Sequence, residues 1–244
     1  MFGIIGGSGL SELSGLAEPS QKVVPTPYGE PSSPLTCGQM AKQPVVFLAR
    51  HGQGHTIPPH RINYRANLWA LRELGVTDVV SVVSVGGIRS DLGTGCLVIP
   101  DQIIDYTWGR DSTYFGDGAP VTHIDFTHPY TPMLRAKIIA AALSRGEQIS
   151  DGGVYATTQG PRLETAAEVE RLARDGADLV GMTGMPEAAL ARELGLQYAA
   201  IAVVVNHAAG RGDSRHAISM DAMGIVLKQG MDRVVRLIES LVGT

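Results

Sequence analysis

Short apolar runs alternate along the chain with longer segments in which apolar residues recur every three or four positions. The short runs predict buried strands, because a strand covered on both faces is apolar along its whole length. They comprise residues 2–5, 45–49, 79–85, 96–99, 179–182 and 198–205. The longer segments predict helices, and several of them end just before a glycine. They comprise residues 61–74, 132–145, 163–175, 186–194 and 221–242.

This alternation predicts an α/β fold, with a mixed β-sheet flanked by helices in a single domain of residues 1–244. The chain has no internal repeat, charge block or low-complexity linker that would divide it. The longest stretch with neither pattern is 108–129, which is rich in Gly, Asp, Thr and His. Loops of this length are usually functional or lie at an interface.

Composition and charge narrow the class of protein. The sequence is 44% hydrophobic and 18% charged, with 30 glycines, which favours a glycine-rich α/β enzyme over a disordered or fibrous chain. The net charge of −4, without a basic stripe, argues against nucleic acid as a partner. Cys37 and Cys96 are too few for a disulfide framework, which fits a reducing cytoplasm. We expect no signal peptide and no membrane contact, because no apolar stretch has the required length.

The first two strand ends carry groups that suit an anion. Residues 2–5 lead into Gly6-Gly7-Ser8-Gly9, whose backbone N–H groups can approach an oxyanion and where Ser8 adds a hydroxyl. This loop lacks the spacing of a dinucleotide fingerprint and the Lys of a P-loop, so a tight structural turn is an equal alternative. After residues 45–49 come Arg50, whose guanidinium suits bidentate phosphate contact, and His51. A surface Arg and a His bonded to the backbone remain the alternative for this pair.

His51, His55 and His60 raise the question of a metal site. The first two have the spacing of a zinc pair on a helix, but the glycines and prolines between residues 52 and 59 disfavour a helix, and no Glu follows the first His. We therefore expect no metal.

Four more strand ends carry polar groups, each of which has a purely structural alternative. Ser84-Val85-Gly86-Gly87 is a second glycine-rich strand end with a serine, and it could bind an oxyanion in the same way as the first loop. Glu164 opens a helix and could simply face its N-terminus. Met182, followed by Thr183, could be a core residue, and Asn206 could close a turn. Six such junctions together predict one composite site.

Several stretches, in order, resemble the trimeric purine-nucleoside phosphorylase family, with the 5′-methylthioadenosine phosphorylases as the nearest branch. They are GGSGL, ARHGQGHTIPPHRINYRAN, SVGGI, TTQGPRLETAAE, GADLVGMTGMPEAALARELGL and VVVN. The resemblance covers nearly the whole chain. It implies the nucleoside phosphorylase fold, a homotrimer with sites near the subunit interfaces, and a nucleoside and inorganic phosphate as small-molecule partners. It implies no cofactor, with phosphate acting as a co-substrate.

The resemblance also implies roles for individual residues. Arg50, His51 and Asn206 are the implied catalytic residues. The implied phosphate ligands are Ser8, Arg50, His51, Ser84 and Thr183. The implied nucleoside-binding residues are Val85, Gly86, Leu163, Glu164, Met182, Asn206, Ala208, Met220, Met223 and His123. Among these, Met182 is expected against the ribose, and His123 is expected to reach the 5′ pocket of the neighbouring subunit.

The implied base pocket departs from the methylthioadenosine branch. That branch ends the corresponding strand with an Asp and carries a second Asp two residues on, where this chain has Asn206 and Ala208. Glu164 matches the Glu of inosine- and guanosine-specific members, whereas the methylthioadenosine branch has a Ser. A 6-oxopurine offers an N1–H donor and an O6 acceptor, which a carboxylate and an amide can satisfy. Adenine has no proton on N1, so a site built around these bonds disfavours it.

The implied 5′ pocket differs from that of inosine-specific members, which place a His near the 5′-hydroxyl. Met220 and Met223 are three positions apart and are expected on one helical face, although core packing is an alternative. Thioethers suit a methylthio group and leave a hydroxyl without a partner. The sequence therefore predicts phosphorolysis of a 6-oxopurine nucleoside with an apolar 5′ group, best S-methyl-5′-thioinosine. The alternatives are an inosine/guanosine phosphorylase, a methylthioadenosine phosphorylase, and a non-catalytic nucleoside-binding module that would not need the phosphate ligands.

Overall fold

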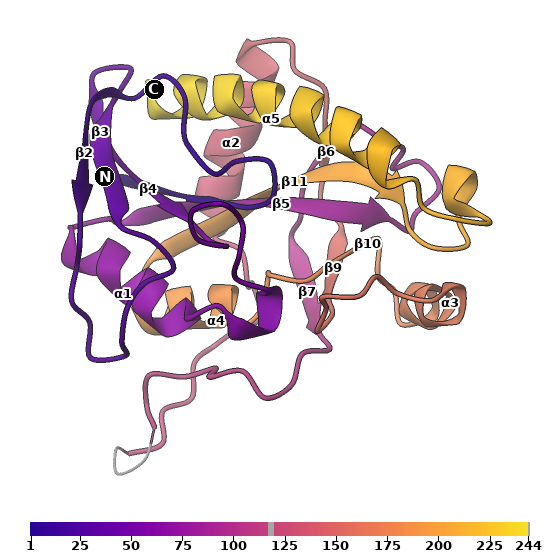
Figure 1. Ribbon diagram of the computed structural model, residues 1–244, viewed down its shortest axis with the longest axis horizontal. Helices are drawn as coiled ribbons and strands as arrows, with labels where there is room; N and C mark the ends of the chain where they lie inside the picture. Colours follow the sequence, from indigo (N-terminus) through magenta and orange to yellow (C-terminus); the bar gives the residue numbers. More distant parts are fainter. Residues whose placement is uncertain (117–119, 244) are drawn as a thin grey trace.

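Eleven strands in the described part of the chain form one mixed β-sheet, and helices cover both of its faces (Figure 1). The computed structural model describes residues 1–116 and 120–243. The strands are β1 (Phe2–Gly6), β2 (Ala17–Lys22), β3 (Leu35–Met40), β4 (Gln43–Ala49), β5 (Asp78–Gly87), β6 (Leu97–Ile99), β7 (Gln102–Asp105), β8 (Ile149–Asp151), β9 (Val154–Thr157), β10 (Leu179–Gly181) and β11 (Gln197–His207). The helices are α1 (Tyr64–Glu73), α2 (Pro132–Ser144), α3 (Ala166–Arg174), α4 (Glu187–Glu193) and α5 (Met220–Val242), with 3₁₀ turns at Pro59–Arg61 and Gly212–Ser214.

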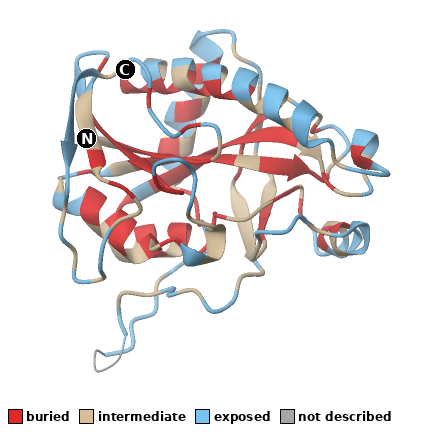
Figure 2. Cartoon of the chain, viewed as in Figure 1, coloured by how far each residue is buried: buried red, intermediate tan, exposed pale blue. Residues whose placement is uncertain are grey.

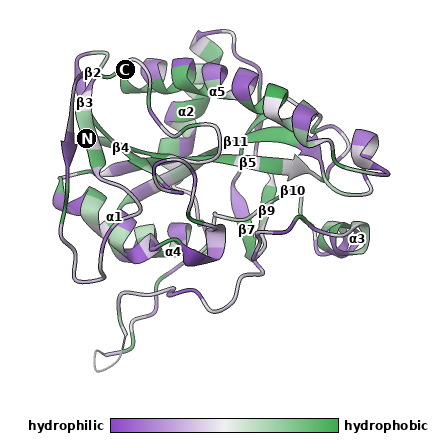
Figure 3. Cartoon of the chain, in the orientation of Figure 1, coloured by the Kyte–Doolittle hydropathy of each residue, from purple (hydrophilic) through white to green (hydrophobic). Residues whose placement is uncertain are grey.

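Four parallel strands form the centre of the sheet, in the order β4, β1, β5, β11. They are the apolar runs of the sequence, and Figures 2 and 3 show them buried and hydrophobic. Because they run parallel, their carboxyl ends meet at one edge of the sheet, which is where ligands bind in open α/β sheets. β10 runs antiparallel to the end of β5 and pairs in parallel with β9, which brings two further strand ends to the same region.

Alternating residues of the central strands face two separate hydrophobic clusters. Ile4 and Phe47 pack in the cluster under α2 and α5, whereas Ile5 and Leu48 pack in the cluster under α1 and α4. This period of two follows from the pleat of a strand, which points successive side chains to opposite faces. The predicted fold class is therefore confirmed.

The structure differs from the predicted elements in three respects. The helix expected from residue 163 begins at Ala166, because Thr165 caps it and Glu168 completes a capping box. β2, β3 and β7 to β9 were not predicted, and β2 is exposed along its whole length. Between Asp105 and Pro132 the described residues form neither helix nor strand, and this segment extends away from the sheet (Figure 1).

No helix in the described residues is long and apolar enough to cross a membrane.

Candidate active site

A cavity of about 530 Å³ lies where the carboxyl ends of β4, β1, β5 and β11 meet the turn after β10. Thirteen of the residues expected at the site line it: Ser8, Arg50, His51, Ser84, Val85, Gly86, Leu163, Glu164, Met182, Thr183, Asn206, Ala208 and Met223. Twelve of them come from six separate strand-to-loop junctions and Met223 comes from α5, so the fold brings together residues that lie far apart in the sequence.

Two expected residues do not line the cavity. Met220 is the first residue of α5 and is 61% exposed, so it does not share the position of Met223. His123 is exposed on the segment that extends away from the sheet. Within this chain, Ile218 lies at the cavity beside Met223 instead.

Arg50 is fully buried, and Glu187, the first residue of α4, holds it in place. Its Nε donates to Glu187 Oε2 at 2.7 Å, and its Nη2 donates to Glu187 Oε1 at 3.0 Å and to Ser81 Oγ at 2.6 Å. Its Nη1 donates to the Val82 carbonyl at 3.0 Å. A guanidinium has five N–H groups. Four are therefore used within the protein, and one on Nη1 remains for a ligand, so this Arg cannot make the bidentate phosphate contact that we expected.

The network around Glu187 extends to other buried hydroxyls. Its Oε1 also accepts from Ser81 at 2.7 Å and from the Tyr198 hydroxyl at 2.8 Å. Burial lowers the pKa of Arg50, but the Glu187 carboxylate more than offsets this and raises the pKa of Arg50 above its ordinary value. Arg50 is therefore a fixed cation whose charge is already paired.

The Gly7 backbone lies directly against the free end of Arg50. A Cβ at Gly7 would lie 2.9 Å from Arg50 Nη1 and 2.6 Å from the Val82 carbonyl oxygen, closer than side chains allow. Only glycine therefore lets this loop, with Ser8 after it, sit beside the remaining N–H of Arg50.

His51 is almost fully buried, and its Nδ1 lies 2.8 Å from the Ile57 carbonyl oxygen. Burial and then the charge of Arg50 lower its pKa to about 4, although the Ile57 carbonyl acts in the opposite direction. The ring of His55 lies 4.3 Å from that of His51, centroid to centroid, and also borders the cavity. At neutral pH His51 is therefore an uncharged imidazole.

Glu164 lies before helix α3 and faces the cavity with one oxygen already bonded. The Thr158 hydroxyl donates to its Oε1 at 2.6 Å. The hydrogen bonds that cap the N-terminus of α3 come from Thr165 and Glu168 rather than from Glu164. Its Oε2 has no hydrogen bond among those found in the described residues and is available to a donor.

Asn206 is held by the backbone at the end of β11. Its side-chain nitrogen donates to the His207 carbonyl oxygen at 2.6 Å, and because a carbonyl only accepts, this contact fixes the orientation of the amide. One N–H and Oδ1 remain for a ligand. A β-bulge between Val204 and Asn206 re-aims this end of the strand, as bulges beside active sites often do.

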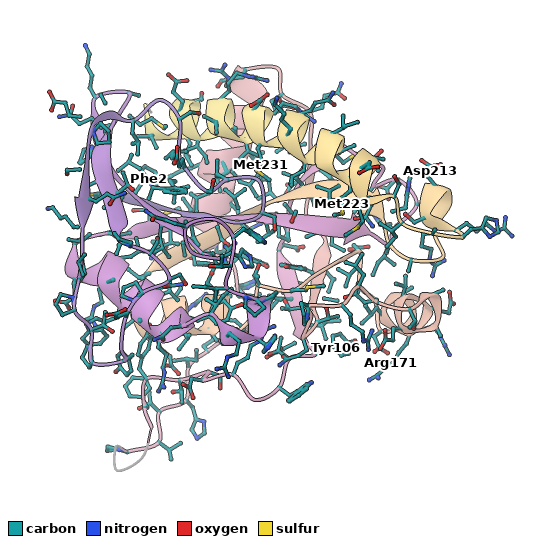
Figure 4. The ribbon with its side chains drawn as sticks, viewed as in Figure 1. Phe2, Tyr106, Arg171, Asp213, Met223 and Met231 are labelled. Atoms are coloured by element: carbon teal, nitrogen blue, oxygen red, sulfur yellow. The ribbon has the colours of Figure 1, made fainter. Side chains whose placement is uncertain are left out.

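The end of the cavity under α5 is apolar. Met223, from the first turn of α5, lines it together with Val205 and Ile218. Figure 4 labels Met223 at the start of α5. The cavity therefore combines hydroxyls and a guanidinium at one end, a carboxylate and an amide at another, and an apolar wall beneath α5.

No group of three or more His, Cys, Asp or Glu side chains that could hold a metal ion occurs among residues 1–116 and 120–243. His51, His55 and His60 therefore form no such cluster there.

Comparison with known proteins identifies the family. The model of the phosphorylase superfamily matches residues 1–242. The chain belongs to the phosphorylase superfamily. It is 53% identical, over 91% of its length and 90% of the relative's, to a probable S-methyl-5′-thioinosine phosphorylase of Xanthomonas campestris. It is 44% identical, over 96% of its length and 89% of the relative's, to a 6-oxopurine nucleoside phosphorylase of Pyrococcus furiosus.

Solved structures of the superfamily share the fold closely. A methylthioadenosine phosphorylase from Schistosoma mansoni, in complex with adenine, superposes with a TM-score of 0.94 at 32% identity, covering 99% of this chain and 90% of that one. A methylthioadenosine phosphorylase from an antarctic soil metagenomic library superposes with a TM-score of 0.92 at 38% identity, covering 99% of this chain and 84% of that one.

Two residues that organise the site in this superfamily member were not indicated by its sequence patterns. The sequence patterns place Glu187 only within the helix predicted for residues 186–194. Arg110, from the segment after β7, donates to the carbonyl oxygens of Met182 at 2.9 Å and Gln159 at 3.0 Å. It thereby ties the turn after β10 to the turn that carries Glu164. Both residues act on partners more than 45 positions away along the chain, which no local pattern encodes.

Proposed function

We propose that the protein catalyses the phosphorolysis of S-methyl-5′-thioinosine, giving hypoxanthine and 5-methylthioribose 1-phosphate. The observation that carries this proposal is the pairing of Glu164 with Asn206 in one cavity. Glu164 Oε2 accepts from N1–H of a 6-oxopurine, and the remaining amide N–H of Asn206 donates to O6. Adenine would place its unprotonated N1 against the carboxylate, so the pair selects against it.

Phosphate occupies the other polar end of the cavity in this proposal. Ser8, Ser84 and Thr183 offer hydroxyls, and Arg50 offers its last N–H. An oxygen of phosphate forms a bond to the anomeric carbon as the bond to the purine nitrogen breaks, and the electron pair of that bond leaves with the purine. The remaining N–H of Asn206, which donates to O6, stabilises the negative charge that spreads onto this oxygen of the departing base. The site acts by positioning and by hydrogen bonds to developing charge, without a covalent nucleophile.

The 5′ substituent lies against Met223, Val205 and Ile218, where a methylthio group is buried favourably and a hydroxyl has no partner. The names of the relatives from Xanthomonas campestris and Pyrococcus furiosus support the 5′ group and the base, respectively. We further propose a homotrimer in the cytoplasm, with His123 and Met220 acting across an interface rather than in their own chain, and a reaction that needs no metal or organic cofactor.

The test is phosphate-dependent cleavage of three nucleosides by the purified protein, compared as kcat/KM. We expect S-methyl-5′-thioinosine to exceed both inosine and methylthioadenosine. A preference for methylthioadenosine would refute the role of Glu164 and Asn206, and a preference for inosine would refute the role of the apolar wall. Arg50→Ala should abolish cleavage of every nucleoside that the parent protein cleaves. No cleavage by the parent protein would favour a nucleoside-binding module.

A further inference from the structure

The protonation of His51 is fixed by its neighbour. The Ile57 carbonyl, 2.8 Å from Nδ1, can only accept a hydrogen bond, so Nδ1 carries a hydrogen. A neutral imidazole has only one N–H, and its Nε2 therefore presents a lone pair. A phosphate oxygen without a proton cannot bond to that lone pair. Contact between Nε2 and phosphate thus needs one extra proton, on the imidazole or on the phosphate.

The charges around the cavity lead to the same requirement. Arg50 is the only Arg or Lys among the described residues that line the cavity, and its charge is paired with Glu187. Glu164 adds a carboxylate to the cavity lining. With both histidines uncharged, the carboxylates of Glu187 and Glu164 outnumber the one guanidinium before phosphate enters. A phosphate dianion would add two more negative charges in a partly buried site, where such repulsion is poorly screened.

Burial and four neighbouring groups set the pKa of His51. Burial and Arg50 lower its pKa to about 4, His55 acts in the same direction, and Glu187 and the Ile57 carbonyl oppose them. Burial also lowers the pKa of His55. Neither ring carries a charge in the free protein at neutral pH, so the extra proton must arrive with the phosphate.

We propose that phosphate binds together with one proton held between His51 Nε2 and a phosphate oxygen, so that the free protein takes up the phosphate monoanion. This inference rests on the phosphate site of the proposed function. The monoanion has two protonated and two unprotonated oxygens. One protonated oxygen meets Nε2, and an unprotonated oxygen is left to attack the anomeric carbon.

Calorimetry of inorganic phosphate binding to the intact protein tests this, in buffers of different ionisation enthalpy. At about pH 8, where phosphate in solution is mainly the dianion, we expect an uptake close to one proton per phosphate bound. At about pH 6 the monoanion already predominates, and the uptake should approach zero. An uptake near zero at the higher pH would overturn the inference.

Two matched variants locate the proton. His51→Gln puts an amide N–H donor near the position of Nε2, so it should bind phosphate without taking up a proton. His55→Gln changes the neighbouring ring and should keep the uptake of the wild type. Uptake that persists in His51→Gln, or that is lost only in His55→Gln, would refute the assignment to His51. If His51→Gln does not fold, the buffer series on the wild type still decides whether a proton is bound.

Kinetics provide a second measurement. The value of kcat/KM for phosphate should fall about tenfold per pH unit above neutrality, because the monoanion becomes scarce. This fall should disappear in His51→Gln. In the wild type, kcat/KM for the nucleoside, measured at saturating phosphate, should not show the same fall. Phosphorolysis without proton uptake would overturn only this inference. Absence of both phosphate binding and phosphorolysis would overturn the proposed function instead.

Discussion

At the scale of single residues, we expect the site to be sensitive to changes in the buried pair of Arg50 and Glu187. Glu187→Gln keeps the shape of the side chain but leaves a buried guanidinium without its counter-charge. We expect a loss of about 3–5 kcal/mol in the free energy of unfolding. We also expect KM for phosphate to rise more than KM for the nucleoside, because Arg50 loses its support. Urea unfolding and steady-state kinetics measure the two effects.

Glu193→Gln provides the control within the same helix. Glu193 accepts from the Thr113 hydroxyl and the Tyr114 N–H, both at 2.7 Å, and has no part in the cavity. Its substitution should lower the free energy of unfolding by about 1 kcal/mol, which is typical of a weakened hydrogen bond. Equal losses in the two variants would contradict a special role for the buried pair.

His51 gives the free protein a defined dependence of stability on pH. Its pKa is about 4 in the folded protein, compared with an ordinary value of 6.5, so the unfolded chain binds a proton first as the pH falls. Stability from this group is constant above about pH 6.5 and is lost between about pH 6.5 and pH 4. His51→Gln removes this loss. The variant should gain at most about 3 kcal/mol relative to wild type across that window, measured by urea unfolding without phosphate. If His51→Gln showed no gain in stability relative to the wild type, a neutral, buried His51 would be contradicted.

The residues at the site could be predicted to different degrees from the sequence. Ser8, Arg50, Ser84 and Asn206 lie at or just after the ends of apolar runs. Parallel strands bring such positions to one edge of the sheet, so their meeting at one cavity was predictable. The use of four Arg50 N–H groups within the protein was not predictable. Glu187 lies 137 positions away, and no periodic pattern in the sequence links residues at that separation.

At the scale of elements, helix α5 contains two glycines whose substitution by Ala would distinguish the effect of packing from that of helix propensity. A Cβ at Gly230 would lie 2.4 Å from Val203 Cγ1 of β11, whereas a Cβ at Gly224 meets nothing within 4 Å. Gly224→Ala should stabilise the protein by up to about 1 kcal/mol through helix propensity. Gly230→Ala should instead destabilise it by roughly 1–3 kcal/mol, because the added methyl overpacks the core. Thermal unfolding checks both. A gain in stability at Gly230 would show that α5 does not pack this tightly on β11.

The predictability of the elements follows their burial. The central strands and the five helices were predicted within a few residues, because one or both faces are apolar. β2 was not, since its six residues are all exposed and include Pro19, which suits an edge strand but leaves no hydrophobic pattern. The start of α3 could have been read from Thr165 and Glu168, which have the spacing of a capping box.

At the scale of the whole molecule, the segment between β7 and α2 links the site to its surroundings. Arg110 anchors the start of this segment to the turns beside the cavity. Further along, His123 is exposed where the segment extends from the sheet (Figure 1). Long loops in a compact domain are usually functional. In the proposed trimer, the symmetry of the assembly and not the local sequence decides which subunit His123 would reach.

Complementation between two inactive variants tests whether His123 serves a neighbour. Arg50→Ala should abolish the site of its own chain, and His123→Ala should weaken the site of the adjacent chain. In co-expressed mixed oligomers, an Arg50→Ala chain supplies an intact His123 to a neighbouring His123→Ala chain, whose own Arg50 is intact. We therefore expect the mixed oligomers to recover kcat/KM well above that of either variant alone, and sedimentation should show trimers in all three preparations. Mixed oligomers no more active than the average of the two variants would place His123 in its own site or outside any site.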